Sequence, residues 1–545
     1  MPFEKLKFMS FEMREKDLLG RIGKLETKSG VVDTPVLLPV INPRIQPIKP
    51  KDMREVFGCR ALITNAYIVQ KQYGHEAVEK GIHKLLDYDG VVMTDSGAYQ
   101  ILIYGDVQVD AEEIVRFQEQ IDTDIATILD IPTGWKVSKD YANKTVEETL
   151  RRAARLWKIK IRDDIAWVGP VQGGQHLELV AKSARKMGKL PFQIYALGSP
   201  TAVMEQYFFD VLVDMVMAAK MNLPVDKPLH LFGAGHPFMF SLAVALGCDL
   251  FDSAAYALFA RDGRYMTENG TARLNELEYL PCCCPVCTKN SPKDLLEKPR
   301  EEKQRLLAEH NLFVSFAELR LIKQAILEGR LWEHLGMRAH AHPSLLQALK
   351  RLRKYEDYFE KNSPVTKSSG LFFYSSVGLA RPEVVRHKKK MAERYLPPEK
   401  GEILFLLPQT SMKPFHKARE WRGIISKVRR GLGEKSSLVH VCTYAAPFGV
   451  VPDELDEVYP LSQHEVAVPL DDETVDYVAG QGASYIERTS YKSVVLLEDR
   501  GMWGNKITNA CRRVCRKKNI DFVNMQREGR ADRLVAQHIL EVLKS

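Results

Sequence analysis

Three closely spaced cysteines could bind one metal ion. Cys282, Cys284 and Cys287 have the spacing C-x-C-x-x-C within the stretch LPCCCPVCTKN, and a tight turn there can bring three thiolates together. His310, in an apolar-periodic stretch downstream, offers a fourth ligand. Three sulfur atoms and one imidazole make a closed tetrahedral zinc site with no open position for water, so we expect one structural zinc ion per chain. Cys283 should point away from it.

A redox dithiol and a disulfide are the alternatives for this cluster. No thioredoxin-like βαβ pattern surrounds it. The stretch MPFEKLKFMSFEMREKD is too charged for a signal peptide, and no apolar run approaches the ~18 residues that a membrane span needs. We therefore expect a cytoplasmic protein without a membrane segment, in which thiols stay reduced. The other cysteines are scattered and fit core positions: Cys59, Cys248, Cys442, Cys511 and Cys515.

A second group of residues with chemical potential lies where apolar runs end. Six residues stand at or just past the C-terminal end of such a run: Asp95, Ser96, Asp130, Gln172, Gly198 and Asp252. A single carboxylate at this place is usually a turn former or a helix cap. Three carboxylates, each with an apolar lead-in, are better explained by catalysis, because a carboxyl group can act as a nucleophile or as a general acid and base.

The apolar runs themselves predict the elements that position these residues. Eight short runs rich in Val, Ile and Leu alternate with longer segments of helical periodicity, which is typical of an α/β fold with a parallel sheet. Eight such units favour a (β/α)₈ TIM barrel, whose active site lies at the C-terminal end of the strands. A doubly wound sheet of five or six units is the alternative. The runs cover residues 36–41, 61–68, 90–97, 125–132, 165–174, 191–199, 228–236 and 248–255.

Six motifs, in chain order, carry a family resemblance over roughly residues 1–345. They are VVMTDSGAYQ, ILDIPTG, VQGG, ALGS, DLFDSAAYALFARDGRYMT, and PCCCPVC followed by HNL. Together they resemble the tRNA-guanine transglycosylases, and most closely the archaeal branch that acts on position 15 in the D-arm of tRNA. The resemblance implies a pentosyltransferase of archaeosine biosynthesis that exchanges guanine in tRNA for 7-cyano-7-deazaguanine (preQ0). It implies no cofactor besides zinc.

The resemblance also implies roles for the carboxylates. Asp252 would be the nucleophile that traps the ribose C1′, and Asp95 would be the general acid and base. Two such groups are what a retaining exchange needs, as in retaining glycosidases. The reverse assignment, with Asp95 as the nucleophile, stays open.

Base recognition by the family maps onto further positions. Asp130 would accept hydrogen bonds from the N1–H and 2-amino groups of guanine, and an unstacked base would enter the pocket. Ser96 belongs to the same substrate-binding set. The carbonyl edge and the 7-substituent would be read by Gln172 and the backbone of Ala196, Leu197 and Gly198. Tyr99 and Phe232 would hold the base between their rings.

Two other functions compete with this interpretation. A non-catalytic RNA-binding subunit should lack one of the carboxylates, yet Asp95, Asp130 and Asp252 are all present. The paralogue archaeosine synthase has a stretch that reads approximately Pro-Tyr-Ser-Lys-Ser, and KPFHKARE (413–420) matches it only in part. That paralogue also tends to lose the barrel carboxylates.

Composition divides the chain into three parts. Residues 1–345 are the predicted catalytic barrel with its zinc-binding insertion, and residues 346–400 are a basic helical and linker segment. Residues 401–545 form a smaller α/β domain, with strands in EILFLLPQ and SLVHVCTYA and the helix HKAREWRGIISKVRRGL between them. Archaeal members of the family usually end in a PUA domain. We see no room for one here and expect either a separate PUA-domain protein or binding of tRNA by the remaining surface.

Positive charge gathers in two segments behind the barrel. Residues 346–395 hold twelve Lys and Arg against five Asp and Glu, and residues 500–545 hold eleven against four, in a chain of net charge +8. Such patches suit RNA phosphates, although two solvated helix faces are the alternative. The resemblance further suggests a homodimer with the zinc region at its interface. The predicted RNA-binding residues are Arg386, Lys388, Lys389, Lys390, Arg512, Arg513, Arg516, Lys517 and Lys518.

Overall fold

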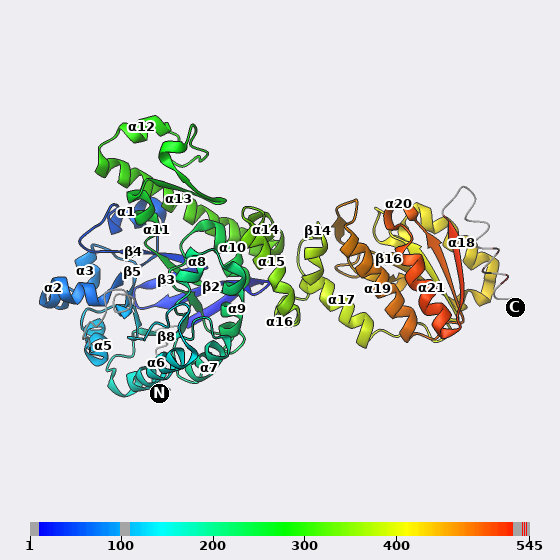
Figure 1. Cartoon of the computed structure of the whole chain (residues 1–545), viewed down its shortest axis with the longest axis horizontal. Helices are drawn as coiled ribbons and strands as arrows, with labels where there is room; N and C mark the ends of the chain where they lie inside the picture. Colours follow the sequence, from blue (N-terminus) through cyan, green and yellow to red (C-terminus); the bar gives the residue numbers. More distant parts are fainter. Residues whose placement is uncertain (1–9, 99–109, 527–536, 538, 540, 542–545) are drawn as a thin grey trace, which may run out of the picture. The chain divides into compact units, whose positions relative to one another are not determined.

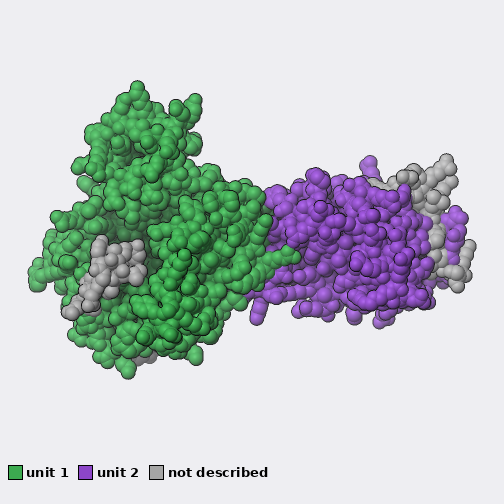
Figure 2. Space-filling view, in the orientation of Figure 1, with its two compact units in different colours: residues 1–355 green, residues 356–545 purple. Residues whose placement is uncertain are grey.

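The chain forms two compact units, residues 1–355 and 356–545 (Figure 2). The computed structural model describes residues 10–98, 110–526, 537, 539 and 541. The boundaries that composition predicts at residues 345 and 400 stay predictions. Among the described helices, none is both long and apolar enough to cross a membrane.

Eight parallel strands close into a barrel in the first unit (Figure 1). The last strand pairs with the first, which confirms the predicted TIM-like barrel and excludes the open, doubly wound sheet. Each strand lies within one of the eight predicted runs. The strands are β4 (Val36–Ile41), β5 (Ala61–Asn65), β6 (Val91–Asp95), β7 (Ile125–Thr127), β8 (Ala166–Val171), β9 (Ile194–Leu197), β10 (Leu229–Leu231) and β11 (Leu250–Ser253).

Helices between the strands cover the outside of the barrel (Figure 1). The strands are apolar on both faces because one face meets this layer of helices and the other fills the barrel. Their local signals are ordinary: Ser138 caps α6 by accepting from the Tyr141 amide, and Asn65 caps α2. The main helices of this layer are α2 (Ala66–Lys80), α5 (Ala111–Gln120), α6 (Lys139–Ile159), α7 (Leu177–Met187), α9 (Phe209–Lys220) and α10 (Pro237–Ala245).

An antiparallel sheet that the sequence did not predict precedes the barrel. It consists of β1 (Ser10–Asp17), β2 (Gly20–Thr27) and β3 (Gly30–Thr34). Leu25 and Val32 from this sheet share one buried cluster with Val91, Ile125 and other residues at the N-terminal ends of barrel strands. The sheet therefore closes the end of the barrel opposite the expected site. Its charged sequence, SFEMREKD, gave no apolar alternation from which a strand could be predicted.

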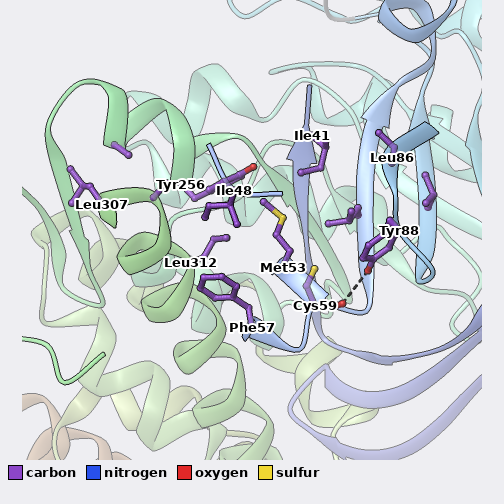
Figure 3. Close-up of a cluster of buried hydrophobic side chains, with 14 of the residues drawn as sticks. Ile41, Ile48, Met53, Phe57, Cys59, Leu86, Tyr88, Tyr256, Leu307 and Leu312 are labelled. Atoms are coloured by element: carbon purple, nitrogen blue, oxygen red, sulfur yellow. Dashed lines mark hydrogen bonds between the residues drawn. The ribbon is translucent and has the colours of Figure 1, made fainter. Parts of the chain in front are cut away.

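The cysteine-rich segment follows the last barrel strand and leads into the longest helix. It lies between the hairpin β12 (Arg264–Thr267) and β13 (Gly270–Arg273) and the helices α12 (Pro292–Glu297) and α13 (Arg300–Leu327). Figure 3 shows the apolar cluster that joins this part to the barrel. Leu307 and Leu312 of α13 belong to the same cluster as Met53 and Phe57 of α1 (Pro50–Phe57) and Tyr256. The insertion is thus anchored to the barrel by a continuous core.

The second unit contains the small α/β domain that the sequence predicts. A five-stranded sheet has the order β17-β16-β15-β19-β20, in which only β17 is antiparallel. The predicted strands are β15 and β16, and the predicted helix between them is α18. The elements are β15 (Ile403–Pro408), α18 (Arg419–Leu432), β16 (Val439–Ala445), β17 (Gly449–Pro452), α19 (Asp472–Arg488), β19 (Ser493–Glu498), α21 (Lys506–Lys518) and β20 (Asp521–Gln526).

Alternate residues of these strands decide which helix covers which face. Phe405 and Leu407 pack with Trp421 of α18, whereas Leu404 and Leu406 pack with residues of α19 and α21. Side chains of a strand point alternately to its two faces, so α18 lies on one side of the sheet and α19 and α21 on the other. Before the sheet, α16 (Glu356–Asn362) contacts α17 (Pro382–Glu393).

Candidate active site

One cavity collects the predicted site residues at the C-terminal end of the barrel strands. Its volume is about 1590 Å³. Ser96, Ala196 and Leu197 are buried at strand ends beside it, and Tyr99 lies outside the described residues. The predicted residues that line it come from six different strands or the turns after them: Asp95, Asp130, Gln172, Gly198, Phe232 and Asp252.

Asp130 and Gln172 form a buried polar pair. Gln172 Nε2 donates to Asp130 Oδ2 at 2.5 Å, and Gln172 Oε1 accepts from the Thr133 amide at 2.9 Å and from Ser199 Oγ at 3.0 Å. Burial raises the pKa of Asp130 to about 6, while the hydrogen bond from Gln172 acts in the opposite direction. At neutral pH Asp130 is therefore mainly a carboxylate, which can accept hydrogen bonds from a ligand.

Gly198 permits this pair to form. A Cβ atom on Gly198 would lie 2.2 Å from Gln172 Nε2, which no relaxed structure tolerates. Any larger residue would displace the Gln172 amide from Asp130. The sequence singles out Gly198 by its position, and the contact supplies the reason for glycine.

Asp95 is a carboxyl group that is easily protonated. Burial is the largest cause, and the nearby charges of Asp130 and Asp252 add to it, so its pKa rises to about 7. The Asn65 side chain donates to Asp95 Oδ2 at 3.0 Å, and its own carbonyl accepts from the Ile68 amide. A carboxyl group with a pKa near neutrality can both give and take a proton.

Asp252 is held by two neighbours from the adjacent strand. Its Oδ1 atom accepts from the Gly233 amide at 3.0 Å. His230 Nε2 lies 2.9 Å from the same oxygen, away from the ideal hydrogen-bonding direction. The His230 side chain is completely buried, and its ring contacts Phe232 edge-on at 4.7 Å.

Two of these supporting residues, Asn65 and His230, were not predicted from the sequence. Asn65 is the last residue of β5, ALITN, but it lies inside the apolar run 61–68 from which that strand was predicted. His230 is a polar residue inside an otherwise apolar strand, LHL. Neither type is distinctive alone, because polar residues at strand ends often cap helices, and Asn65 caps α2 as well.

The four predicted metal ligands lie together. The ligand atoms of Cys282, Cys284, Cys287 and His310 are all within 4.8 Å of one another. His310 Nδ1 is 3.3 Å from Cys287 Sγ and 3.5 Å from Cys284 Sγ, and the two sulfur atoms are 3.5 Å apart. Thiolates at about 2.3 Å and an imidazole at about 2.0 Å from a central ion require such spacings. The residues therefore fit a tetrahedral metal ion.

Surrounding groups orient the His310 imidazole, and Cys283 lies outside the ligand group. His310 Nε2 lies 2.9 Å from the Met266 carbonyl oxygen, which fixes the ring so that Nδ1 faces the sulfur atoms. The Tyr265 ring stacks on His310 at 3.7 Å, and its hydroxyl lies 3.3 Å from Cys287 Sγ. Cys283 is exposed.

The predicted RNA-binding residues of α17 are mostly engaged in ion pairs. Arg386 contacts Glu360 at 3.1 Å, Lys388 contacts Glu356 at 3.1 Å, and Lys389 contacts Asp357 at 2.8 Å. These carboxylates all come from α16. Lys390 is exposed. The charge that looks available in the sequence is thus largely balanced within the unit.

The basic residues of helix α21 are partly paired and partly exposed. Lys517 contacts Glu487 at 2.7 Å, and Lys518 donates to the Glu487 carbonyl at the end of α19. The Arg512 guanidinium lies over the Phe522 ring. Arg513 and Arg516 are exposed on the outer face.

A third basic surface, on α18, was not predicted from the sequence. The outer face of α18 exposes five cationic side chains and one carboxylate, Glu420. Arg429 lies 3.2 Å from Asp453. The helix was predicted, but which of its charges face solvent depends on how Trp421 packs against the sheet. The five are Arg419, Arg422, Lys427, Arg429 and Arg430.

The chain is similar to known proteins over most of its length. Residues 16–344 match the family described as Queuine tRNA-ribosyltransferase, and residues 384–544 match a domain of unknown function, DUF5591. A tRNA-guanine(15) transglycosylase of Pyrobaculum aerophilum is 46% identical over 84% of this chain and 90% of its own length. Proteins of the same name from Methanocaldococcus jannaschii and Sulfolobus acidocaldarius are 44% and 40% identical, over 84% and 89% of this chain and 68% and 95% of their own lengths.

Metal content should separate the ligands from the bystander in the cysteine cluster. We expect Cys284→Ser to lower the bound metal well below one ion per chain and to lower the melting temperature, because three ligands hold the ion less tightly and the insertion loses a cross-link. Cys283→Ser, the matched control, should leave both unchanged. Elemental analysis measures the bound metal, and thermal unfolding measures the melting temperature of the purified variants. Equal metal loss from both variants would contradict the assignment of Cys282, Cys284 and Cys287 as the three thiolate ligands.

Proposed function

Since the chain belongs to the queuine tRNA-ribosyltransferase family, whose members are pentosyltransferases, we propose that it exchanges guanine 15 of tRNA for preQ0. The observation that carries the proposal is the single cavity in which Asp95, Asp130 and Asp252 lie with Gln172 and Gly198. Exchange of a guanine base in tRNA is the activity that the names of its relatives state. That the exchanged guanine is at position 15 and that the incoming base is preQ0 are proposals beyond base exchange itself. Three carboxylates in one cavity do not favour a non-catalytic subunit.

Asp252 is the proposed nucleophile. Both of its supporting contacts, from the Gly233 amide and near His230, are made by Oδ1, and we assign the attack on the ribose C1′ to Oδ2. As the new C–O bond forms, the C1′–N9 bond breaks and its electron pair passes to the leaving guanine. A glycosyl ester joins Asp252 to the tRNA. Incoming preQ0 then attacks C1′ through its own ring nitrogen and releases the carboxylate.

Asp95 is the proposed proton carrier. With a pKa of about 7 it can be protonated when guanine leaves and so donate to a ring nitrogen. It is then a carboxylate, which can accept the N9 proton of the incoming base. The same group therefore serves both halves of the exchange, as acid and then as base.

Asp130 and Gln172 are the proposed readers of the base. The Asp130 carboxylate suits the N1–H and 2-amino donors that guanine and preQ0 share. Gln172 holds Asp130 with one N–H and has a second N–H for the 6-carbonyl oxygen. The backbone at Leu197 and Gly198 is assigned to the 7-substituent, and Phe232 is assigned to one face of the base. These assignments give recognition of the base without contact to the rest of the tRNA.

Zinc is the metal that the donor set favours. Cys282, Cys284, Cys287 and His310 would hold it with four protein ligands, which makes the ion structural. When bound it cross-links the cysteine segment to α13. It supplies no group to the reaction. The pairing of two chains and the separate PUA-domain protein stay predictions of the resemblance.

Exposed basic residues of the second unit are the proposed contacts for tRNA phosphates. Arg513 and Arg516 on α21, and Arg419 and Arg422 on α18, remain open to solvent. Lys389 on α17 contacts two carboxylates, Asp357 and Glu360. The proposed contacts are thus the accessible cations: two belong to the predicted basic segment 500–545, and two lie on α18, outside the predicted segments. Contacts of this kind add affinity without base specificity.

A trapped adduct should identify the nucleophile. We expect Asp252→Asn to abolish both exchange of labelled guanine and any protein–tRNA complex that survives denaturation, because no carboxylate remains to attack C1′. Asp95→Asn should slow turnover by about 10²- to 10⁴-fold but still permit some adduct. Denaturing gels and label retention measure the two effects. An adduct that persists in the Asp252 variant and disappears in the Asp95 variant reverses the assignment.

The first half of the reaction should depend on pH through Asp95. Its carboxyl group is protonated below a pKa of about 7, and the Asp130 carboxylate that binds the base is protonated below about 6. The single-turnover rate of adduct formation should therefore be highest between about pH 6 and 7. Above about pH 7 it should fall about tenfold per pH unit, because the acid form of Asp95 becomes scarce. Asn65→Ala removes a hydrogen bond that favours the carboxylate, so the midpoint should move to higher pH. A flat profile between pH 6 and 9 contradicts this role.

Binding of tRNA should weaken when exposed cations are removed. Arg513→Ser with Arg516→Ser, and separately Arg419→Ser with Arg422→Ser, should raise the KM for tRNA and flatten its dependence on salt. Single-turnover exchange at saturating tRNA should stay within about twofold of the unmodified protein. Lys389→Ser is the matched control, because this lysine is already paired. If neither double variant changes KM or the salt slope, both surfaces are merely solvated.

A further inference from the structure

The cavity is larger than one base requires. Its volume of about 1590 Å³ exceeds the about 300–1,000 Å³ of a typical small-molecule site. The groups assigned to base recognition, Asp130, Gln172 and Gly198, occupy only one part of its wall. The remaining wall is available to another portion of the ligand.

Aromatic side chains line the cavity beyond these groups. Trp135 lies five residues after Asp130 in the turn that follows β7, and Tyr207 lies in the segment between α8 (Thr201–Glu205) and α9. Tyr207 is 42% exposed although it is a large aromatic residue. Exposed aromatic rings beside a nucleic-acid site offer faces on which unpaired bases stack.

Both rings are held on rigid supports. The turn that carries Trp135 is fixed at Thr133, whose amide donates to Gln172 and whose hydroxyl accepts from the Gly173 amide. The Tyr207 ring packs against Phe238 at 5.8 Å, Phe209 at 5.7 Å and His342 at 4.9 Å. A face that is already ordered loses little conformational freedom when a base stacks on it.

One local feature costs stability and suggests a function. Tyr207 has a φ angle of 60°, a left-handed conformation that a bulky residue rarely adopts and that tends to occur at functional sites.

We propose that Trp135 and Tyr207 form a stacking site for a second unpaired nucleobase of the tRNA, next to the guanosine that is exchanged. The inference rests on the proposed function, since it requires tRNA in this cavity. It adds a contact that free guanine and preQ0 cannot make. The site therefore distinguishes a base within an opened RNA arm from the free base in solution.

The test separates KM for tRNA from KM for free guanine. We expect Trp135→Ala and Tyr207→Ala to raise the KM for tRNA about tenfold or more, the usual effect of removing one stacking ring. The KM for free guanine and the kcat at saturating tRNA should stay within about twofold. Trp135→Phe and Tyr207→Phe keep a stacking face and should restore most of the affinity. Tyr279→Ala, at a tyrosine that is 83% exposed and does not line the cavity, is the control.

A fluorescent base locates the contact directly. The tRNA carries 2-aminopurine on either side of the exchanged guanosine, one position at a time. Binding to the unmodified protein should quench one of the two probes by stacking, and Trp135→Ala or Tyr207→Ala should remove that quenching. Both variants must still form the Asp252-dependent adduct, which shows that they fold. If Trp135→Ala unfolds, Trp135→Leu and Tyr207→Ala provide the same test.

Three outcomes overturn the inference. An unchanged KM for tRNA in both alanine variants means that the rings contact no base. An equal rise of KM for guanine and for tRNA places them in the guanine pocket itself. Absence of quenching at both probe positions excludes a stacked neighbour. Failure of the proposed function looks different, because the unmodified protein would then neither exchange guanine nor form an adduct.

Discussion

Closure of the barrel is the constraint on which the active site depends. In strand β11, Leu250 pairs with Val36 and Asp252 pairs with Leu38 of β4, the first barrel strand in the chain. This pairing brings the last strand back to the first, so the C-terminal ends of all eight strands form one rim. In an open sheet Asp252 would lie at an edge, separated from Asp95 and Asp130. The antiparallel sheet at the other end leaves this rim as the open face.

The site then derives its chemistry from crowding acidic groups in a buried place. Burial, with the nearby charges of Asp130 and Asp252 adding to it, raises the pKa of Asp95 to about 7, while Gln172 opposes the effect of burial on Asp130, whose pKa is about 6. Environments that differ in this way can give three identical side chains different roles. Small supporting residues control the difference: Asn65 beside Asp95, Gly198 behind Gln172, and the Gly233 amide on Asp252.

Charge in the second unit illustrates why formal counts mislead. Lys388 and Lys389 belong to one of the two most basic segments of the chain, yet α16 supplies carboxylates to both. The outer face of α18 attracts less notice in the sequence, but Arg419 and Arg422 are exposed there. An ion pair that already exists offers little to an incoming phosphate, so the accessible cations determine where RNA can be held.

The sequence by itself determined the parts of this protein that depend on neighbours in the chain. Runs of Val, Ile and Leu identified all eight barrel strands, because a buried parallel strand needs such residues on both faces. The spacing of Cys282, Cys284 and Cys287 identified three members of a group that could hold a metal ion, because a single turn brings them together. Their position at the end of an apolar run identified Asp95, Asp130 and Asp252 as candidate site residues.

Only the tertiary structure decided what arises between distant segments. It shows that the barrel is closed and not an open sheet, because no local sequence pattern indicates that β11 pairs with β4. It revealed the sheet β1–β3. The few apolar residues of this sheet that reach the barrel core, such as Leu25, lie among charged residues, so they form no recognisable strand pattern. It also revealed His230 beside Asp252 and the ion pairs of α17. Each depends on partners far away in the chain, and short-range periodicity carries no information about them.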